Sequence, residues 1–430
     1  MGKEYLSRII DEELDVYLEA FGAVLVIGPK WCGKTTTSSK KAKSILKLQD
    51  PDKSLGYLVT AEIKPSLLLE GNKPRLIDEW QMAPVLWDAV RTSVDEIGEE
   101  GLYILTGSTS VDESNIMHSG TGRIARLKMY PMSLFESKES NGSISLDELF
   151  NNKIYIIDGK TSQLSINDLV FAACRGGWPS SLSKKSKRAK LLVAKSYVDN
   201  IVESDISTVD GKTRDTTKVS NLLKSYARNV GTTVSNKTIL DDINTNTNFS
   251  ESSFYEYINA LNKLYVIQDV PAWNPSIRSK TSIRSHTKKM FVDPSIMVAS
   301  LGLSPDLLLQ DLHTFGFLFE NLCIRDLKVY ASSLGGKISY YRDRMNLEVD
   351  AVLHLRDGRY ALIEFKLSTS QIEEGAKHLL EVVDLIKKAN NKKKGLNLKE
   401  PDLLMIITGG EIAYTRNDGV MIIPIGCLKN

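Results

Sequence analysis

Apolar runs and amphipathic stretches alternate along the first third of the chain. The runs at 23–27, 76–77 and 102–105 are short, apolar and partly β-branched, which is typical of buried strands. Residues 5–19 place apolar side chains near helical spacing, and residues 36–48, rich in Lys, Ser and Leu, also favour a helix. This alternation predicts an α/β domain.

The middle of the chain has a helical pattern. Residues 168–204 favour helices, and 217–264 carry further apolar stripes at helical spacing. The run at 265–270 reads as a strand, with 290–293 as its hairpin partner. Helices followed by a hairpin are typical of a winged helix, which binds DNA or protein.

Two further segments remain, the polar stretch before the helical part and the last third of the chain, which has a mixed pattern. A polar stretch at 137–167, with one short strand at 154–157, is predicted to be a linker. After a helical stripe at 317–330, the pattern predicts an α/β domain. Its expected strands lie at 338–341, 347–353, 360–367, 403–407 and 420–423, with an amphipathic helix at 371–388.

Composition narrows the class of protein. The 430 residues are 42% hydrophobic and 25% charged, which is ordinary for a globular chain with two or three cores. The net charge of +2 does not by itself indicate nucleic acid. The four cysteines include no C-x-x-C pair, which argues against zinc and a disulfide framework and fits a reducing cytoplasm. No apolar run reaches the ~18 residues of a spanning helix, and the charged N-terminus does not read as a secretory signal, so we expect no membrane contact.

The most specific pattern is segment 28–36, which reads G-x-x-x-x-G-K-T-T between a strand and a helix. Its glycines let backbone N–H groups point inward, and the helix N-terminus attracts phosphate. Lys34 is expected to reach the β- and γ-phosphates, and Thr35 to ligate Mg²⁺. The alternative is a glycine turn that happens to carry a lysine. The residues predicted to bind the cofactors ATP and Mg²⁺ are Gly28, Pro29, Lys30, Trp31, Cys32, Gly33, Lys34, Thr35 and Thr36.

A second motif lies where the strand after Pro74 ends in Asp78 and Glu79. Asp78 would hold Mg²⁺, directly or through water, and Glu79 would polarise the attacking water as general base. The alternative is a solvated strand end. Ser108, with Thr106 as the second choice, would sense the γ-phosphate or the water, unless this strand end is a simple turn.

Two arginines follow a glycine-rich loop at 120–122. Arg123 or Arg126 would neutralise transition-state charge at the γ-phosphate. The sequence leaves open whether either acts in its own subunit or in a neighbour.

Four ordered motifs, G-P-K-x-x-G-K-T-T, L-I-D-E-x-Q, I-L-T-G-S and G-R-I-x-R-L-x-M-Y-P-M-S, carry a family resemblance. The chain resembles prokaryotic AAA-type P-loop ATPases that join this domain to a C-terminal domain of unknown function. The resemblance covers nearly the whole chain. It implies a winged-helix part, a restriction-endonuclease-like ending and homo-oligomeric rings. A GTPase is disfavoured because no N-K-x-D motif follows.

Charged residues on the C-terminal strands form a second constellation. Strand alternation places Glu364 and Lys366 on one face, and Asp350 lies on the strand before. This order resembles the PD-(D/E)XK nuclease core. There Asp350 and Glu364 would hold Mg²⁺, Lys366 would orient or activate the water, and Glu320 on the preceding helix would support the metal. The alternatives are a half-buried hairpin with one charged face, or a nuclease-like domain kept as a binding module.

The turn between these strands offers a geometric check. A two-residue Asp357-Gly358 turn would pair Asp350 with Phe365 and separate the acids. A three-residue loop with a glycine bulge would pair Asp350 with Lys366 and bring the acids together. We predict the odd-length loop.

A dense basic cluster lies between the strands of the predicted hairpin and suits contacts with DNA phosphates. The alternative is a solvated basic loop. Weaker clusters occur at 184–190 and 392–394. The residues of the dense cluster are Arg278, Lys280, Arg284, His286, Lys288 and Lys289.

We therefore expect an ATPase domain at 1–136, a linker at 137–167, a helical and winged-helix segment at 168–305, and a nuclease-like domain at 306–430. The predicted function is Mg²⁺-dependent ATP hydrolysis by a cytoplasmic protein that acts on DNA, with the ATP state controlling the nuclease-like domain. The alternative is an ATP-driven switch that binds DNA or a protein partner without cutting. A plain small-molecule kinase is disfavoured by the acidic pair and by the large C-terminal half.

Overall fold

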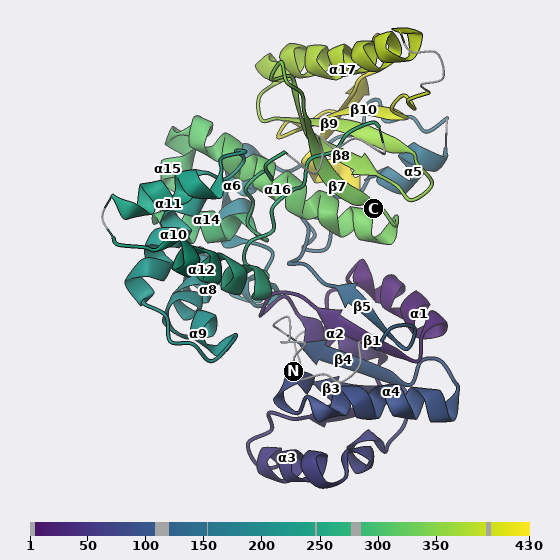
Figure 1. The fold of residues 1–430 in the computed structure, drawn as a ribbon. Coiled ribbons are helices and arrows are strands. Elements are labelled where there is room, and N and C mark those ends of the chain that lie inside the picture. The colour runs from purple at the N-terminus through teal and green to yellow at the C-terminus, as the bar shows by residue number, and fades with distance from the viewer. Residues whose placement is uncertain (1–4, 108–119, 153, 246, 277–284, 393–396) are drawn as a thin grey trace.

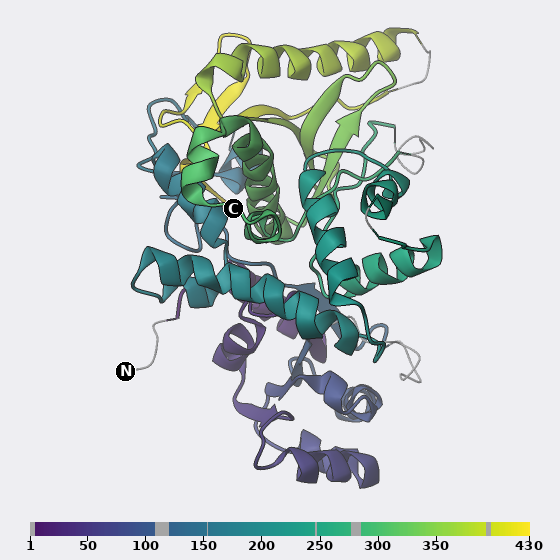
Figure 2. The same ribbon diagram turned by 90° about the vertical axis from the view of Figure 1, so that its left-hand side faces the viewer.

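The structure, a computed structural model, describes residues 5–107, 120–152, 154–245, 247–276, 285–392 and 397–430. Figure 1 shows three parts: a small sheet with its helices at the bottom, a helical part at the left, and a second sheet at the upper right. Figure 2, turned by 90°, shows the helical part lying across the junction of the two sheets. None of the described helices is long and apolar enough to cross a membrane.

The N-terminal sheet has five strands in the order β2-β3-β4-β1-β5, and every neighbouring pair is parallel. Alternate residues of a strand face opposite sides, so Val24 and Val26 pack with one core and Ala23 and Leu25 with the other. The strands are β1 (Ala23–Ile27), β2 (Ser44–Lys47), β3 (Arg75–Asp78), β4 (Tyr103–Gly107) and β5 (Ile124–Lys128).

Helices cover both faces of this sheet. The core with Val24 contains residues of α1, and the core with Leu25 contains residues of α4. The helices and 3₁₀ turns of this part are α1 (Ile10–Ala20), α2 (Lys34–Lys41), α3 (Ser54–Ile63), η1 (Pro65–Leu69), η2 (Trp80–Met82) and α4 (Val85–Ile97).

The predicted helix at 36–48 is wrong in its second half. Helix α2 ends at Lys41, and residues 44–47 form the edge strand β2. Helix α2 carries no apolar side chain, so no helical stripe continues beyond it; within β2, Leu46 is buried and Ile45 is exposed, as in a half-buried strand.

Ser and Asp N-caps begin most helices of the middle part. Ser250, for example, accepts a hydrogen bond from the backbone of Ser253, as a capping residue does. The helices are α6 (Ile166–Arg175), α7 (Pro179–Leu182), α8 (Lys187–Asn200), the π-helix η4 (Ile201–Asp205), α9 (Ile206–Thr208), α10 (Thr216–Arg228), α11 (Asn236–Asn244), α12 (Glu251–Lys263), α14 (Pro294–Leu301) and α15 (Pro305–Gln310).

The segment after α12 pairs with the segment before α14. Two antiparallel bridges join Ile267 to Phe291 and Val270 to Lys288. The pairing predicted for 265–270 and 290–293 is present, and it extends to Lys288.

The predicted strand at 154–157 is wrong. Ile154 and Ile156 are exposed and have no pairing strand. The predicted linker at 137–167 instead has its regular structure before that run: α5 (Leu146–Asn151) and the two-residue strand β6 (Ile144–Ser145), which pairs with β13 (Leu428–Lys429) near the C-terminus.

The C-terminal sheet has the order β11-β12-β10-β9-β8-β7. Strands β9, β10 and β12 are parallel, and the other neighbours are antiparallel. Helices α16 and α17 cover opposite faces (Figure 1). Their bounds are α16 (Leu312–Ser333), β7 (Lys337–Arg342), β8 (Glu348–His354), β9 (Tyr360–Lys366), η5 (Thr369–Gln371), α17 (Ile372–Lys392), β10 (Leu403–Thr408), β11 (Tyr414–Thr415), β12 (Met421–Pro424) and η6 (Ile425–Cys427).

Candidate functional site

The phosphate loop runs from Gly28, at the end of β1, to the first turn of α2. A Cβ at Gly28 would lie 2.2 Å from the carbonyl oxygen of Met129, so only glycine fits there. Gly33 has a φ of 106°, which glycine adopts without strain. The two glycines are needed for different reasons, close approach and backbone conformation.

Lys34 and Thr35 lie inside this loop. The Lys34 ammonium is buried and donates hydrogen bonds to the carbonyl oxygens of Gly28 (2.9 Å) and Pro29 (2.8 Å). The Thr35 hydroxyl donates to Oδ1 of Asp78 at 2.7 Å. The structure therefore brings the two sequence motifs together.

Asp78 is the acid at the centre of this site, and it is 1% exposed. Thr106 donates to the same Oδ1 at 2.6 Å, whereas Oδ2 has no hydrogen-bond partner among the described residues. A buried carboxylate oxygen without a partner is costly unless another group satisfies it. Since Mg²⁺ prefers oxygen ligands, Asp78 and Thr35 fit a magnesium–nucleotide complex.

Glu79 directly follows Asp78 in the left-handed region, with a φ of 57°. Its backbone N–H donates to the Thr106 hydroxyl at 3.3 Å, and Gln81 donates to its carboxylate. Thr106, the second choice of the sequence analysis, thus contacts both acids. Ser108, the first choice, lies outside the described residues.

The two candidate arginines lie at different heights on β5. Arg123 comes just before the strand, where its carbonyl accepts from Ala23, and its side chain pairs with Asp95 at 2.7 Å. Strand β1 runs parallel to β5, so Arg123 lies at the end of the sheet opposite the phosphate loop, about 13 Å of strand away. Arg123 therefore lies away from the phosphate loop of its own chain, and its predicted role at a nucleotide stays a prediction. Arg126 lies in mid-strand opposite Leu25 and is exposed.

The sequence analysis missed Arg8. This buried guanidinium donates to the carbonyl of Cys32 (2.8 Å) in the phosphate loop and to that of Tyr130 (2.7 Å) beyond β5. It also pairs with Glu136 at 3.0 Å. No sequence signal marks an arginine that binds backbone carbonyls from outside a motif.

Two variable positions of the phosphate loop contact the helical part. Lys30 pairs with Asp205 of the π-helix η4 at 2.7 Å. The ring of Trp31 lies 5.6 Å from that of Tyr197 on α8, and Tyr197 lies 4.2 Å from Trp178. The loop is therefore attached directly to α8 and η4.

The turn between β8 and β9 has odd length, as predicted. His354 pairs with Tyr360, and a backbone hydrogen bond from Leu355 to Arg359 (2.8 Å) closes a three-residue loop at 356–358. Gly358 has a φ of 84° within this loop.

The pairing of Asp350 differs from the prediction by two residues. Continued by one position, the observed register places Asp350 opposite Glu364 rather than Lys366, because the loop begins one residue earlier than expected. Oδ2 of Asp350 accepts the backbone N–H of Phe365 at 2.9 Å. The two predicted acids therefore lie on neighbouring strands at the same level.

The acidic cluster of the C-terminal part consists of Glu320, Glu348, Asp350 and Glu364. Glu364 is buried and pairs with Lys366 at 2.9 Å. His378 on α17 lies 3.8 Å from Glu364, whose carboxylate raises the pKa of this histidine. The predicted Glu364–Lys366 face is therefore present and covered by α17.

Lys288 enters this cluster from the middle part. Its ammonium lies 2.8 Å from Glu320, 2.7 Å from Glu348 and 3.5 Å from Asp350. Burial alone would lower the pKa of Lys288, but the charges of Glu320, Asp350 and Glu348 raise it well above its ordinary value. Burial raises the pKa of Glu320 to about 8, against the opposing charge of Lys288.

These contacts do not fit the predicted metal set. Among the described residues, no group of three or more His, Cys, Asp or Glu side chains has the arrangement of a metal site. A cation bound between Glu320 and Asp350 would meet the Lys288 ammonium, and two cations repel. We therefore derive no metal chemistry from Glu320, Asp350 and Glu364.

The predicted basic cluster is partly wrong. Lys288 and Lys289 are buried and ion-paired, Lys289 with Asp269 at 3.0 Å, so neither can contact DNA phosphates in this arrangement. His286 is exposed. Arg278, Lys280 and Arg284 lie outside the described residues, as do 393 and 394 of the weaker cluster.

Two other lysines lie where the three parts meet. The Lys128 ammonium, at the end of β5, lies 5.3 Å from the ring centres of Tyr130 and Tyr265, and burial lowers its pKa to about 8. Burial and the charge of Lys128 lower the pKa of Lys328 on α16 to about 7. Lys328 donates to the carbonyl of Gln268 at 2.7 Å. Neither lysine forms a salt bridge with a described acid.

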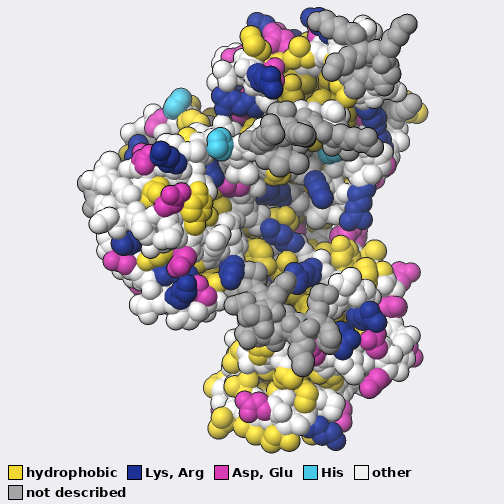
Figure 3. Space-filling model, viewed as in Figure 1, with side chains coloured by type: hydrophobic (Ala, Val, Ile, Leu, Met, Phe, Trp, Pro, Cys, Tyr) yellow, Lys and Arg dark blue, Asp and Glu magenta, His cyan; other side chains and the backbone are white. Residues whose placement is uncertain are grey.

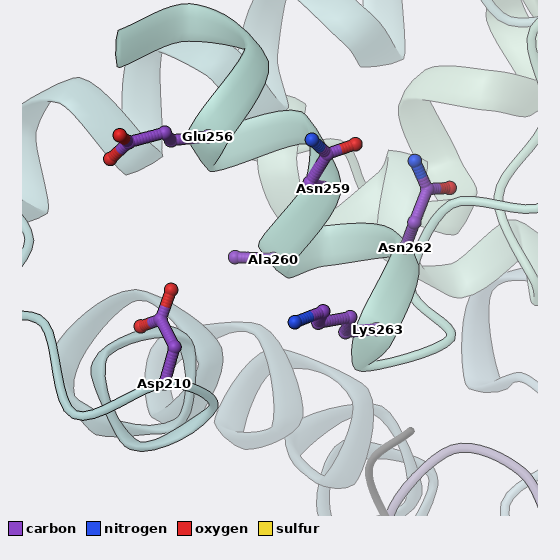
Figure 4. Close-up of a pocket in the computed structure, with 6 residues that line it drawn as sticks. All are labelled: Asp210, Glu256, Asn259, Ala260, Asn262 and Lys263. Atoms are coloured by element: carbon purple, nitrogen blue, oxygen red, sulfur yellow. The ribbon is translucent and has the colours of Figure 1, made fainter. Parts of the chain in front are cut away.

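A pocket of about 430 Å³ lies on the helical part, away from these sites (Figure 4). None of the residues singled out from the sequence lines it. The lining residues are Asp210, Glu256, Asn259, Ala260, Asn262 and Lys263.

Three family models match separate parts of the chain. Residues 20–138 match the AAA domain, residues 166–307 match a domain of unknown function (DUF8612), and residues 315–428 match another (DUF4143). The AAA-domain match and the phosphate loop identify the chain as a P-loop ATPase, a class that binds and hydrolyses ATP, normally with Mg²⁺.

Comparison with curated proteins and with solved structures adds little to the identification of the ATPase. No curated protein matches the chain. The Walker-type ATPase of Pyrococcus abyssi is 14% identical, with 67% of this chain and 94% of that chain covered and a TM-score of 0.38. A mutant RuvB of Thermotoga maritima is also 14% identical, with 60% and 89% covered and a TM-score of 0.25. These scores are too low to carry an argument.

Proposed function

We propose that this ATPase is a nucleotide-driven switch that acts on DNA. The observation that carries the proposal is the direct attachment of the phosphate loop to the helical part, through Lys30 to Asp205 and through Trp31 to Tyr197. Nucleotide binding at the loop would change these contacts, and the helical part would respond.

The proposed chemistry assigns a task to each residue of the site. Lys34 would exchange its hydrogen bonds with the loop carbonyls for bonds to phosphate oxygens. Thr35 and Asp78 would hold a magnesium ion, which would supply positive charge to offset that of the phosphates. Glu79 accepts a proton from the attacking water, held in place by Gln81 and Thr106.

The proposed link to the helical part works through the loop's own backbone. The Lys34 ammonium contacts the carbonyl of Pro29, and Lys30 and Trp31 follow Pro29 in the loop. When this ammonium moves to the phosphates, the backbone at Lys30 and Trp31 would move with it. The π-helix η4 at Asp205 is a local irregularity of the kind often found at functional sites.

The DNA part of the proposal is supported by two lysines whose pKa is lowered by burial and which an anion would return to the charged form. Lys128 and Lys328 lie at the junction of three parts without a salt bridge to a described acid. Figure 3 shows Lys and Arg side chains gathered at the waist above the ATPase part. A DNA phosphate near both ammonium groups would restore their charged form.

DNA-stimulated ATP hydrolysis tests this proposal. We expect duplex DNA to raise the hydrolysis rate several-fold at low salt, and the Lys128→Gln, Lys328→Gln double variant to lose this stimulation while keeping the basal rate. Lys195→Gln, which changes an exposed lysine on α8, is the matched control. No stimulation by DNA would contradict the DNA part and leave a protein as the partner.

Asp205→Asn tests the link itself. This variant should keep basal hydrolysis, because the phosphate loop itself is unchanged. It should lose most of the stimulation, because asparagine lacks the charge that pairs with Lys30. Asp199→Asn, which breaks a pair within α8, should behave like the parent protein. Equal stimulation in both variants would contradict the link.

The alternative function, ATP-controlled cleavage by a nuclease-like domain, is less well supported because Lys288 lies among the acids that would bind metal. Cleavage of DNA with Mg²⁺ or Mn²⁺ that disappears in Asp350→Ala would restore it.

A further inference from the structure

The acidic cluster of the C-terminal part already holds a cation. The Lys288 ammonium is within 3.5 Å of oxygens of Glu320, Glu348 and Asp350, and its side chain is 1% exposed. The two shorter contacts have the length of charge-assisted hydrogen bonds.

The backbone around Lys288 holds this side chain in place. Lys288 and Val270 exchange both N–H···O hydrogen bonds, each 2.9 Å long. The ring of Tyr340 on β7 lies 5.6 Å from the ammonium, and its hydroxyl donates to the carbonyl of His286. These contacts fix the backbone of Lys288 beside the cluster.

The same segment is joined to the C-terminal sheet. The backbone of Tyr340 donates to Pro271 (3.0 Å) and accepts from Trp273 (2.6 Å), so 271–273 runs along the edge strand β7. The Lys288 contacts therefore lie at the seam between the middle part and the C-terminal sheet.

We propose that Lys288 is the resident cation of the acidic cluster, and that this ionic lock, rather than a divalent metal, joins the C-terminal sheet to the paired segments 266–270 and 288–292. In the proposed switch the C-terminal domain then acts as a binding module. The lock does not depend on ATP hydrolysis, so it can be tested separately from the ATPase.

Manganese binding to the nucleotide-free full-length chain tests the lock. Electron paramagnetic resonance counts bound Mn²⁺ ions directly. We expect the parent protein and Asp350→Asn to bind equal numbers of ions. Lys288→Met should bind one more ion than the parent, and the acidic cluster of this variant should bind Mn²⁺ at least tenfold more tightly than the cluster of the parent. The double variant Lys288→Met, Asp350→Asn should lose this additional ion.

Lys289→Met is the matched control. Lys289 is the next residue, is also buried, and pairs with Asp269 and Asn236 instead of the cluster. It should bind no additional Mn²⁺. Lys288→Arg, which keeps the charge, should also bind no more than the parent.

Either of two results would overturn the proposal. One is Mn²⁺ binding by the parent protein that Asp350→Asn removes. The other is a folded Lys288→Met variant that gains no site. If Lys288→Met does not fold, the comparison of the parent with Asp350→Asn still decides whether a metal occupies the cluster.

Discussion

Two threonine hydroxyls share one oxygen of Asp78, and its other oxygen has no partner among the described residues. This arrangement orients the carboxylate before a ligand arrives. Thr35 lies in the first turn of α2 and Thr106 in β4, so Asp78 at the end of β3 connects the phosphate loop to the neighbouring strand. At the scale of single residues, the site is defined by these hydrogen bonds.

Thr106→Val should lower ATP hydrolysis about tenfold while the protein stays folded, because valine keeps the shape and removes one oriented hydrogen bond. Steady-state hydrolysis with saturating Mg²⁺ and ATP measures the effect. Thr60→Val on α3, where the hydroxyl bonds the carbonyl of Gly56, is the control and should leave the rate unchanged. An unchanged rate in Thr106→Val would show that Asp78 needs no such support.

Lys328 gives a second residue-scale prediction, on pH. Its folded-state pKa of about 7 lies below the ordinary value of 10.5, through burial and the charge of Lys128, against the charge of Asp269. Between these two values the unfolded chain binds more protons, so this lysine makes the folded state more stable as the pH rises. The expected gain is on the order of 1 kcal/mol per pH unit at most.

Urea unfolding at pH 7, 8 and 9 measures this effect. Lys328→Met should flatten the pH dependence of the unfolding free energy relative to the parent, whereas Lys195→Met, at an exposed position, should not. Parallel curves for Lys328→Met and the parent would contradict the lowered pKa.

How far the sequence predicted these residues depends on whether a motif contains them. The spacing of 28–36 and the Asp78-Glu79 pair were sufficient to predict the phosphate loop and its acid. Arg8 and Lys288 act by burial against segments that are distant in the sequence, such as Tyr130 for Arg8 and Asp350 for Lys288. No local pattern indicates such partners.

At the scale of elements, α8 and η4 receive the phosphate loop. Trp31 is 43% exposed and its ring packs against that of Tyr197 at a tilt of 59°, so its environment should change when the loop binds nucleotide. The slowly hydrolysed analogue ATPγS should change tryptophan fluorescence in the parent protein.

Trp31→Phe should remove most of this fluorescence change. Trp273→Phe, which replaces a tryptophan of the C-terminal seam, should keep it. If the change survives in Trp31→Phe, the loop does not transmit its state through this contact.

Element predictions succeeded for the strands and helices with a strong pattern. They failed for the second half of 36–48 and for the apolar run 154–157, whose Ile154 and Ile156 are exposed. The odd length of the loop between β8 and β9 was predicted from the need to bring two acids together. Its position at 356–358 was not predicted, because either Arg356 or Arg359 could be the third loop residue beside Asp357 and Gly358. The predicted helix extended beyond the true end of α2, because polar residues carry no helical stripe that would mark that end. The predicted domain boundaries remain a prediction.

At the scale of the whole molecule, α16 joins all three parts. Its buried Arg325 pairs with Asp293 before α14 (3.1 Å) and with Asp326 (2.7 Å), and Asp326 accepts the backbone N–H of Leu134 (3.0 Å). Each part therefore depends on the others for buried partners.

Arg325→Met should destabilise the protein by about 3–5 kcal/mol, because it leaves buried carboxylates without a counter-charge. Urea unfolding followed by circular dichroism measures the loss. Arg416→Met, which removes a pair with the exposed Glu373, should change stability by less than about 1 kcal/mol. A small loss in Arg325→Met would contradict a single interdependent core.

The most direct test of the account is ATP hydrolysis with and without Mg²⁺, measured beside ATP binding, in the parent protein, Lys34→Ala and Glu79→Gln. We expect Mg²⁺-dependent hydrolysis by the parent and loss of ATP binding in Lys34→Ala. Glu79→Gln should bind ATP normally and hydrolyse it about 100-fold more slowly. Hydrolysis that persists in Lys34→Ala, or that needs no Mg²⁺, would contradict the assignment of this site as the ATPase centre.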